Sequence, residues 1–221
     1  MSRRLATIAL QPSLARLAYA GVDDMSSQGG SQGDLVDVTL TVTAALERCG
    51  IRYTVGGSLA SSFAGEPRSS IDADIVVEMR HEQIEPFLAA LGDEFYADLD
   101  GLRRAIRSGS STNLVHRPTG VKVDLFAASS LLDRQQLERR RRILVKSAPD
   151  RFMFVHSPED ILLQKLHWYR SGGEVSERQW RDALSIVLVQ GERLDREYLA
   201  GMAAQAGVDD LLIRVLREAG V

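Results

Sequence analysis

The sequence is poor in the features that mark secreted, membrane-spanning or nucleic-acid-coating proteins. Its 221 residues contain one cysteine, Cys49, so the chain can form neither an internal disulfide nor a cysteine-rich zinc site. The formal net charge is −3, without the overall basic excess of proteins that coat nucleic acid. No stretch approaches the roughly 18 uninterrupted apolar residues of a membrane span. We therefore expect a cytoplasmic protein that has no membrane partner.

Apolar residues, in contrast, are present in ordinary supply. They make up 44% of the chain, which is enough to bury a core. A polar, glycine-rich stretch over residues 26–34 is typical of a linker. We therefore predict three parts: a disordered or weakly ordered arm over residues 1–33, a core over 34–150, and a C-terminal helical region over 151–221.

Hydrophobic spacing in the first half predicts alternating helices and strands. Apolar residues recur at a near-helical interval over 35–49. A short apolar strand over 52–57 leads directly into a helical segment over 58–65. Residues 71–79 become continuously apolar, which indicates a buried strand, and residues 81–95 form an amphipathic helical pattern.

The second half predicts a change from strands to helices. We expect a strand meander over 96–126, a helix over 129–145 and a strand over 151–157. Ser157 and Ser176 each precede a helical pattern with acidic residues near its start, so each is a predicted N-cap. This order predicts an α+β fold: a small mixed β-sheet flanked by helices and followed by a C-terminal helical region.

A glycine turn follows the first predicted strand. Gly56 and Gly57 stand between the strand and the next helix, and Ser58 opens that helix. Glycines at such a turn let the backbone approach a phosphate, and the helix N-terminus favours an anion. The Ser58 hydroxyl could cap the helix or donate to a phosphate oxygen. Strand–glycine–helix turns are common, so this motif alone does not establish a phosphate site.

Two aspartates open the next strand. Asp72 and Asp74 are two residues apart, so on a strand their side chains point to the same face. Two carboxylates this close repel each other, and Mg²⁺ removes that repulsion because it binds carboxylate, water and phosphate oxygens. The alternative is a pair of solvated acids at a strand edge, which is the more common meaning of an isolated pair.

A third aspartate, Asp124, stands inside the apolar strand pattern of residues 121–126. If this strand lies beside the first, a third carboxylate allows a second metal ion about 4 Å from the first. Asp124 would then be a metal ligand and a candidate general base for an attacking hydroxyl. The alternative is a buried aspartate that is satisfied by the protein itself.

Together, these motifs resemble the DNA polymerase β-like nucleotidyltransferase superfamily. The matching segments are residues 55–58, 68–77 and 121–126, and the resemblance spans roughly residues 38–126. It implies that a nucleoside triphosphate such as ATP binds with two Mg²⁺ ions, with Mn²⁺ as the alternative. It also implies transfer of a nucleoside monophosphate to a hydroxyl, a reaction that depends on positioning and charge neutralisation.

The C-terminal half is similar to the helical part of the AbiEii-type branch, whose members occur in toxin–antitoxin and phage-defence systems. By that resemblance Lys165 binds phosphate, Asp182 orients it or contacts the nucleotide, and Arg68 lies near the phosphates. Arg178 and Asp182 are four residues apart on a predicted helix, so they could pair. Ordinary surface charge is the alternative for these residues.

The sequence leaves more than one function open. The first is a magnesium-dependent nucleotidyltransferase acting on a hydroxyl of a small molecule, a protein or a tRNA end. The second is a low-turnover antitoxin or regulator with the same fold, and the third is a phosphotransferase. The basic run over residues 139–142 is expected on a helix, either as a solvated face or as a contact for tRNA phosphates.

Overall fold

The computed structural model describes residues 30–221. Its helices and strands alternate through the first two thirds of the chain and are exclusively helical after Val155. In chain order they are α3 (Gly30–Arg48), β1 (Arg52–Val55), α4 (Gly57–Ala64), β2 (Asp72–Glu78), η1 (His81–Gln83), α5 (Ile84–Leu91), β3 (Phe95–Ala97), α6 (Leu99–Ser108), β4 (Ser111–His116), β5 (Lys122–Ala127), α7 (Leu131–Arg139), β6 (Arg141–Ser147), β7 (Asp150–Val155), α8 (Pro158–Ser171), α9 (Glu177–Gln190), η2 (Gly191–Arg193), α10 (Arg196–Ala206) and α11 (Asp209–Glu218).

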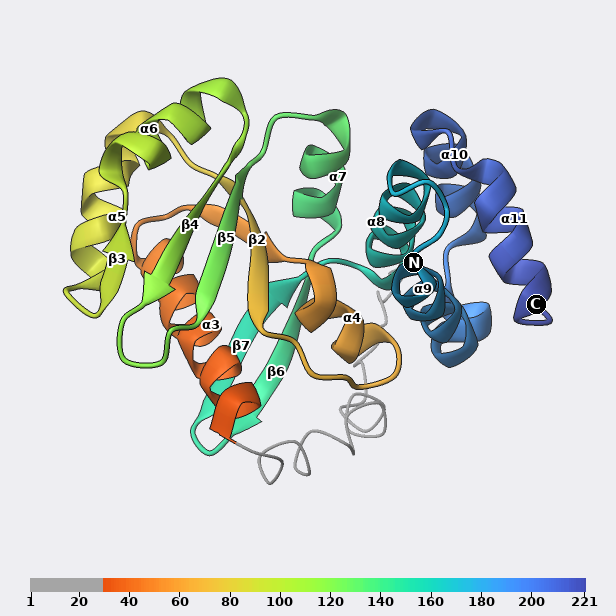
Figure 1. Ribbon diagram of the computed structural model, residues 1–221, viewed down its shortest axis with the longest axis horizontal. Helices are drawn as coiled ribbons and strands as arrows, with labels where there is room; N and C mark the ends of the chain where they lie inside the picture. Colours follow the sequence, from red (N-terminus) through yellow and green to blue (C-terminus); the bar gives the residue numbers. More distant parts are fainter. Residues whose placement is uncertain (1–29) are drawn as a thin grey trace, which may run out of the picture.

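The strands form one mixed sheet in the order β3-β4-β5-β2-β1-β7-β6. Neighbouring strands are antiparallel except for β2 with β5 and β1 with β7, which are parallel. Strands β2 and β5 are far apart in sequence but lie side by side at the centre of the sheet (Figure 1). The predicted fold class, a mixed sheet flanked by helices and followed by a helical region, is confirmed.

One face of the sheet is buried beneath α3, α5 and α6. Ala73, Ile75 and Val77 of β2 and Val123 and Leu125 of β5 all belong to this core. Because side chains alternate along a strand, the intervening residues of β2 and β5 point to the opposite face. The burial pattern therefore decides on which face of the sheet the aspartates of these strands lie.

A second core lies to one side of the sheet. There α4 packs against α8 and α9, and α10 and α11 complete the layer (Figure 1). Ser157 and Ser176 cap α8 and α9 by accepting hydrogen bonds from the N–H groups of Asp160 and Gln179, as predicted. Within the described residues, no helix is long and apolar enough to span a membrane.

The boundaries of the predicted parts stay a prediction. Strand β7 continues the sheet to Val155, and the helical region begins with α8 at Pro158. Helix α3 begins at Gly30, whereas residues 1–29, which make up most of the predicted arm, lie outside the described residues.

The expected strand meander over 96–126 is wrong in its first part, because Leu99–Ser108 forms helix α6. Asp98 caps this helix by accepting from the N–H of Asp100, and Gly109 ends it in the left-handed conformation. The apolar side chains of Leu102 and Ala105 are buried, while of the two arginines between them Arg103 is partly buried and Arg104 is exposed. The helix contains Gly101, although glycine is a residue typical of turns.

The expected helix over 129–145 ends earlier than predicted. Helix α7 stops at Arg139, Arg140 leaves it, and Arg141 and Arg142 begin the edge strand β6. Ile143 and Val145 are buried against the sheet, whereas Leu144 is 40% exposed. This alternation of buried and exposed residues is typical of a strand. The four consecutive arginines gave no sign of it, since arginine is tolerated on both helices and edge strands.

Candidate functional site

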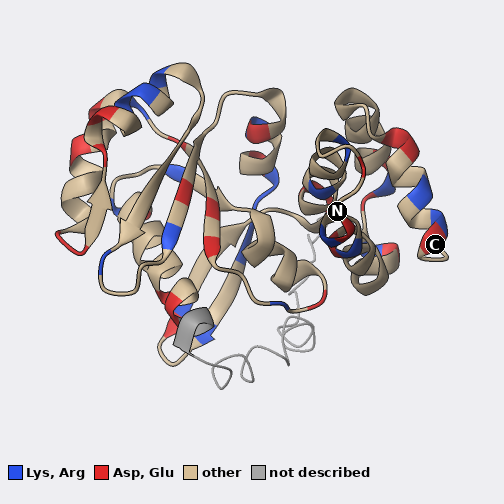
Figure 2. Cartoon of the chain, viewed as in Figure 1, with Lys and Arg blue, Asp and Glu red and all other residues tan. Residues whose placement is uncertain are grey.

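Asp74 and Asp124 occupy matching positions on adjacent parallel strands. Their Cα atoms are register partners in the β2–β5 pair, and Asp72 is opposite Lys122 in the same ladder. Neighbouring strands are about 4.8 Å apart, so the two carboxylates stand side by side on the face turned away from α3. Acidic residues on the two central strands are visible as adjoining red segments (Figure 2). The structure thus brings Asp72, Asp74 and Asp124 to one face of the sheet.

Burial and the neighbouring carboxylates together shift the pKa of Asp74. Burial raises the pKa of its carboxyl from 3.8 to about 6, and the negative charges of Asp72 and Asp124 add to the increase. The positive charges of Lys165 and Lys122 act in the opposite direction but do not cancel it. A cation bound among the three carboxylates would relieve this repulsion.

Asp124 is held by a cation of the protein itself. The Lys122 ammonium lies 2.8 Å from the Asp124 carboxylate, two residues away on the same face of β5. Within residues 30–221, no group of three or more His, Cys, Asp or Glu side chains is arranged as a metal site. In chemical type the three aspartates suit a divalent ion, because carboxylate oxygens are the ligands that Mg²⁺ and Mn²⁺ prefer.

The raised pKa of Asp74 predicts a pH-dependent stability in metal-free buffer. The folded state holds the carboxyl proton more tightly than the unfolded chain does, so this contribution to stability is present below pH 3.8 and is lost as the pH rises through about 6. The loss is at most about 3 kcal/mol. Denaturant unfolding from pH 4 to 8 should show a falling free energy of unfolding for the native protein relative to Asp74→Asn.

Addition of Mg²⁺ provides the control for this pH series. At pH 8 it should stabilise the native protein, because a bound ion offsets the carboxylate repulsion, and it should have a smaller effect on Asp74→Asn. Parallel pH profiles of the two proteins would contradict the assignment of Asp74 as the strained carboxylate.

The glycine turn is built around Asp74. Gly57 has φ +62°, and a Cβ atom placed on it would lie 1.8 Å from Oδ2 of Asp74. The N–H of Gly56 donates to the carbonyl of Asp74 at 2.8 Å. The turn and the aspartate therefore form one unit, in which the missing side chain of Gly57 makes room for the carboxylate.

Two further side chains contact the turn: Gln164, from the middle of α8, and His156, which comes just before that helix. Gln164 Oε1 accepts the N–H of Gly57 at 3.3 Å, and a Cβ on Gly56 would lie 2.5 Å from Nε2 of His156. Burial lowers the pKa of His156 to about 3, so its imidazole is neutral, and its Nδ1 is hydrogen-bonded to Thr54 Oγ1 at 3.0 Å. The packing of the protein itself therefore requires glycine at positions 56 and 57, whether or not a phosphate binds at the turn.

Ser58 and Arg68 lie next to this turn. Arg68 Nη2 donates to Ser58 Oγ at 2.6 Å, and Nε and Nη2 of Arg68 form a two-pronged contact with Asp182 at 2.9 and 2.8 Å. Gly56, not Ser58, is the N-cap residue of α4, so the capping role that Ser58 could have had is taken by a glycine. The hydroxyl is instead directed to the arginine.

Lys165 joins the same group from α8. Its Nζ lies 2.8 Å from Oδ2 of Asp182, and its side chain is fully buried. In the described part of the chain the ion pairs of Asp182 are with Arg68 and Lys165, and the pair with Arg178 that the spacing allows does not form. The structure therefore assembles Ser58, Arg68, Lys165 and Asp182 beside the glycine turn, although their roles stay predictions.

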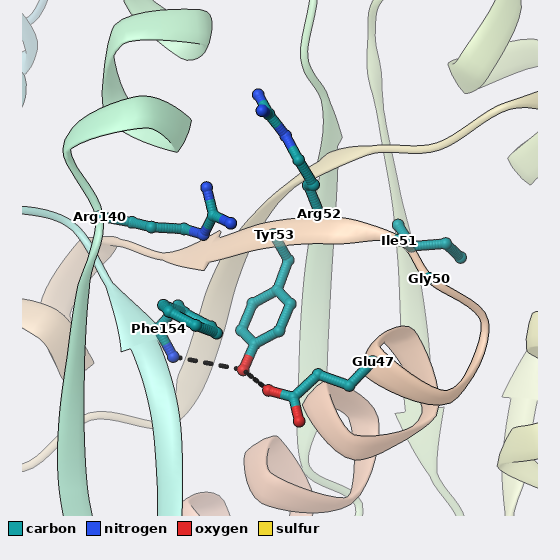
Figure 3. A pocket seen from close by; sticks show the side chains of 7 residues that line it. All are labelled: Glu47, Gly50, Ile51, Arg52, Tyr53, Arg140 and Phe154. Atoms are coloured by element: carbon teal, nitrogen blue, oxygen red, sulfur yellow. Dashed lines mark hydrogen bonds between the residues drawn. The ribbon is translucent and has the colours of Figure 1, made fainter.

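A cavity of about 250 Å³ lies elsewhere, at the start of β1. Figure 3 shows Tyr53 pointing toward Glu47, with its hydroxyl donating to Glu47 Oε1 at 2.8 Å and accepting the N–H of Phe154 at 3.2 Å. None of the predicted site residues lines this cavity, which is at the opposite end of β1 from the glycine turn. This cavity is therefore separate from the face of the sheet that carries the aspartates.

Solved structures with a fold similar to that of this chain include the following two proteins. The crystal structure of an antigenic nucleotidyltransferase-like protein from Paracoccidioides brasiliensis matches with a TM-score of 0.51 and 20% identity, over 81% of this chain and 91% of that one. This chain has a nucleotidyltransferase-like fold. The solution structure of the antibiotic-resistance factor ANT(2'')-Ia also matches, with a TM-score of 0.51 and 13% identity, over 81% of this chain and 97% of that one.

Sequence comparison adds no family assignment to this nucleotidyltransferase-like fold. No protein-family model matches the chain, and no curated protein is significantly similar to it in sequence. Neither structural neighbour is described as AbiEii-type, so that branch stays a prediction. At these levels of identity the structural matches establish the fold, while the chemistry has to be argued from the residues.

Three residues that contact the site were missed by sequence reasoning. Lys122 was detectable, because it lies two positions before Asp124 and therefore on the same face of the strand. Gln164 and His156 carried no such signal, since their contacts with the glycine turn span about a hundred residues of sequence.

Proposed function

We propose that this protein is a magnesium-dependent nucleotidyltransferase that moves a nucleoside monophosphate from a triphosphate to an acceptor hydroxyl. The observation that carries the proposal is the in-register pairing of Asp74 with Asp124 on parallel strands, with Asp72 on the same face and the glycine turn against Asp74. The nucleotidyltransferase-like fold supports it independently.

Asp72, Asp74 and Asp124 would hold two divalent ions, Mg²⁺ or Mn²⁺. Such ions supply charge neutralisation for the triphosphate and lower the pKa of an attacking hydroxyl. Asp124 would accept the proton of that hydroxyl, and this requires its carboxylate to leave Lys122, whose side chain is 47% exposed and can turn toward solvent.

The charged residues beside the turn would attract the phosphates. Arg68, Lys165 and Asp182 carry a combined charge of +1 next to Ser58, which suits an anion. Ser58 and the backbone of Gly56 and Gly57 would contact phosphate oxygens at the start of α4. Substrate binding is then a matter of orientation and charge, in keeping with the demands of nucleotidyl transfer.

The acceptor is proposed only as a hydroxyl on a small molecule, a protein or a tRNA end. One structural neighbour is described as an antibiotic-resistance factor and the other as an antigenic protein. These descriptions differ from each other and from the toxin–antitoxin role that the AbiEii resemblance implies. The proposal therefore leaves the acceptor to be identified by experiment.

The test is incubation with each of the four nucleoside triphosphates, labelled at the α-phosphate, together with Mg²⁺ and a cell extract. We expect label from at least one triphosphate to appear on an acceptor in the extract, with release of one pyrophosphate per transfer. Release of nucleoside diphosphate instead would indicate a phosphotransferase.

The alternative function is a low-turnover antitoxin or regulatory module. It is favoured by one observation: Asp124, Arg68 and Lys165 are all engaged in ion pairs within the protein. In the labelling experiment, a protein that binds triphosphate and never releases pyrophosphate would support this module and contradict the transferase.

A further inference from the structure

The ammonium group of Lys165 has no access to solvent. Its side chain is 0% exposed, and Nζ lies 2.8 Å from Oδ2 of Asp182. Among the described residues Nζ has no hydrogen-bond partner beyond this ion pair, and its other close neighbour is the Trp168 ring, with the centroid at 5.3 Å. Since a buried charge is costly unless it is paired, Asp182 supplies the direct contact that compensates Lys165, and the charge of Asp74 adds a longer-range attraction.

Asp182 connects Lys165 to a more exposed cation. Its carboxylate accepts from both Nε and Nη2 of Arg68, which is the two-pronged geometry that fixes a guanidinium in its plane. The side chains of Lys165, Asp182 and Arg68 are 0%, 7% and 26% exposed, respectively. The three charges thus form a row that runs from the interior to the surface.

Arg68 is the member of this row that can meet a ligand. A guanidinium has five N–H groups, and within residues 30–221 Arg68 uses four of them in bonds to Asp182, Ser58 and Ser69. The remaining N–H is on Nη1, on the more exposed side of the group. The Lys165 side chain is 0% exposed, so it could contact a phosphate only if the side chains that cover it moved aside.

We propose that Lys165 is a positioning residue that binds no phosphate: it holds Asp182, Asp182 fixes Arg68, and Arg68 contacts the triphosphate. This inference rests on the proposed function, and it reverses the role that family resemblance gives to Lys165. The direction of the pKa shifts agrees with it. The hydrogen bonds from Arg68 and Lys165 outweigh burial and lower the pKa of Asp182, so the carboxylate that joins the two cations stays ionised, although burial lowers the pKa of Lys165.

A double-mutant cycle separates positioning from direct binding. Lys165→Met, Asp182→Asn and the double variant are compared with the native protein for equilibrium binding of ATP, GTP, CTP and UTP, each with Mg²⁺. We expect Lys165→Met to weaken binding about tenfold in the native background and to have almost no effect once Asp182 is Asn, because both changes release Arg68. A direct phosphate ligand would lose the same factor in both backgrounds, which would overturn the proposal.

A conservative variant guards against a general loss of structure. Lys165→Gln retains a donor for Asp182 without the charge, so positioning predicts affinity within about threefold of the native protein, whereas direct binding predicts the full loss. Arg178→Gln is the matched control, since Arg178 lies near Lys165 electrostatically but outside the row. We expect it to leave affinity unchanged.

The cycle also distinguishes this inference from the proposed function. If the native protein binds none of the four triphosphates, the transferase assignment fails, and the role of Lys165 fails with it. If the native protein binds a triphosphate and Lys165→Gln loses affinity as fully as Lys165→Met does, only the positioning role is overturned.

Discussion

Asp74→Asn is expected to reduce nucleotidyl transfer by at least about 10³-fold while the chain remains folded. Asp74 lies between Asp72 on its own strand and Asp124 on the neighbouring one, so its loss removes the central ligand for the proposed ions. The substitution also removes a carboxylate that is strained in metal-free protein, so it should not destabilise the fold. Transfer of labelled nucleotide is measured beside circular dichroism and thermal unfolding.

Glu78→Gln is the matched control for this variant. Glu78 stands on the same strand, is half-exposed and pairs with Arg52, so the substitution changes the charge by the same amount away from the site. Its activity should stay within about twofold of the native protein, as is usual for exposed positions. Asp72→Asn is expected to behave like Asp74→Asn, and full activity in both aspartate variants would remove the enzymatic assignment.

Gly57→Ala is expected to abolish activity and to destabilise the protein. The new methyl group would lie 1.8 Å from Oδ2 of Asp74, so either the turn or the carboxylate must move. The φ of +62° adds a conformational cost for any residue with a side chain. We expect a loss of about 1 kcal/mol from the backbone conformation and about 1–3 kcal/mol from the collision, measured by denaturant unfolding.

Gly50→Ala isolates the backbone part of this effect. Gly50 has nearly the same φ, +63°, but a Cβ there meets no atom within 4 Å. It should therefore lose about 1 kcal/mol and keep full activity. Combining Gly57→Ala with Asp74→Ala should recover part of the stability but none of the activity. Equal losses for Gly50→Ala and Gly57→Ala would show that the close contact with Asp74 has no energetic weight.

Local sequence was sufficient for those features that depend on a few neighbouring residues. The two-residue spacing of Asp72 and Asp74 placed both on one face, since a strand repeats every two residues. Ser157 and Ser176 were recognised as N-caps because a helix start leaves N–H groups that a nearby side chain must satisfy. The same local reasoning failed for α6 and for β6. Helix α6 contains Gly101, a residue type common in turns, and β6 begins within a run of four arginines that is equally compatible with a helix.

Tertiary structure alone decided which distant segments meet. No local pattern states that β2 and β5 are parallel neighbours in register, yet that pairing is what brings Asp124 to Asp74. The row of Arg68, Asp182 and Lys165 likewise spans more than a hundred residues. Burial depends on what the rest of the chain packs over a side chain, so only the folded molecule reveals that Lys165 is enclosed while Arg68 reaches the surface.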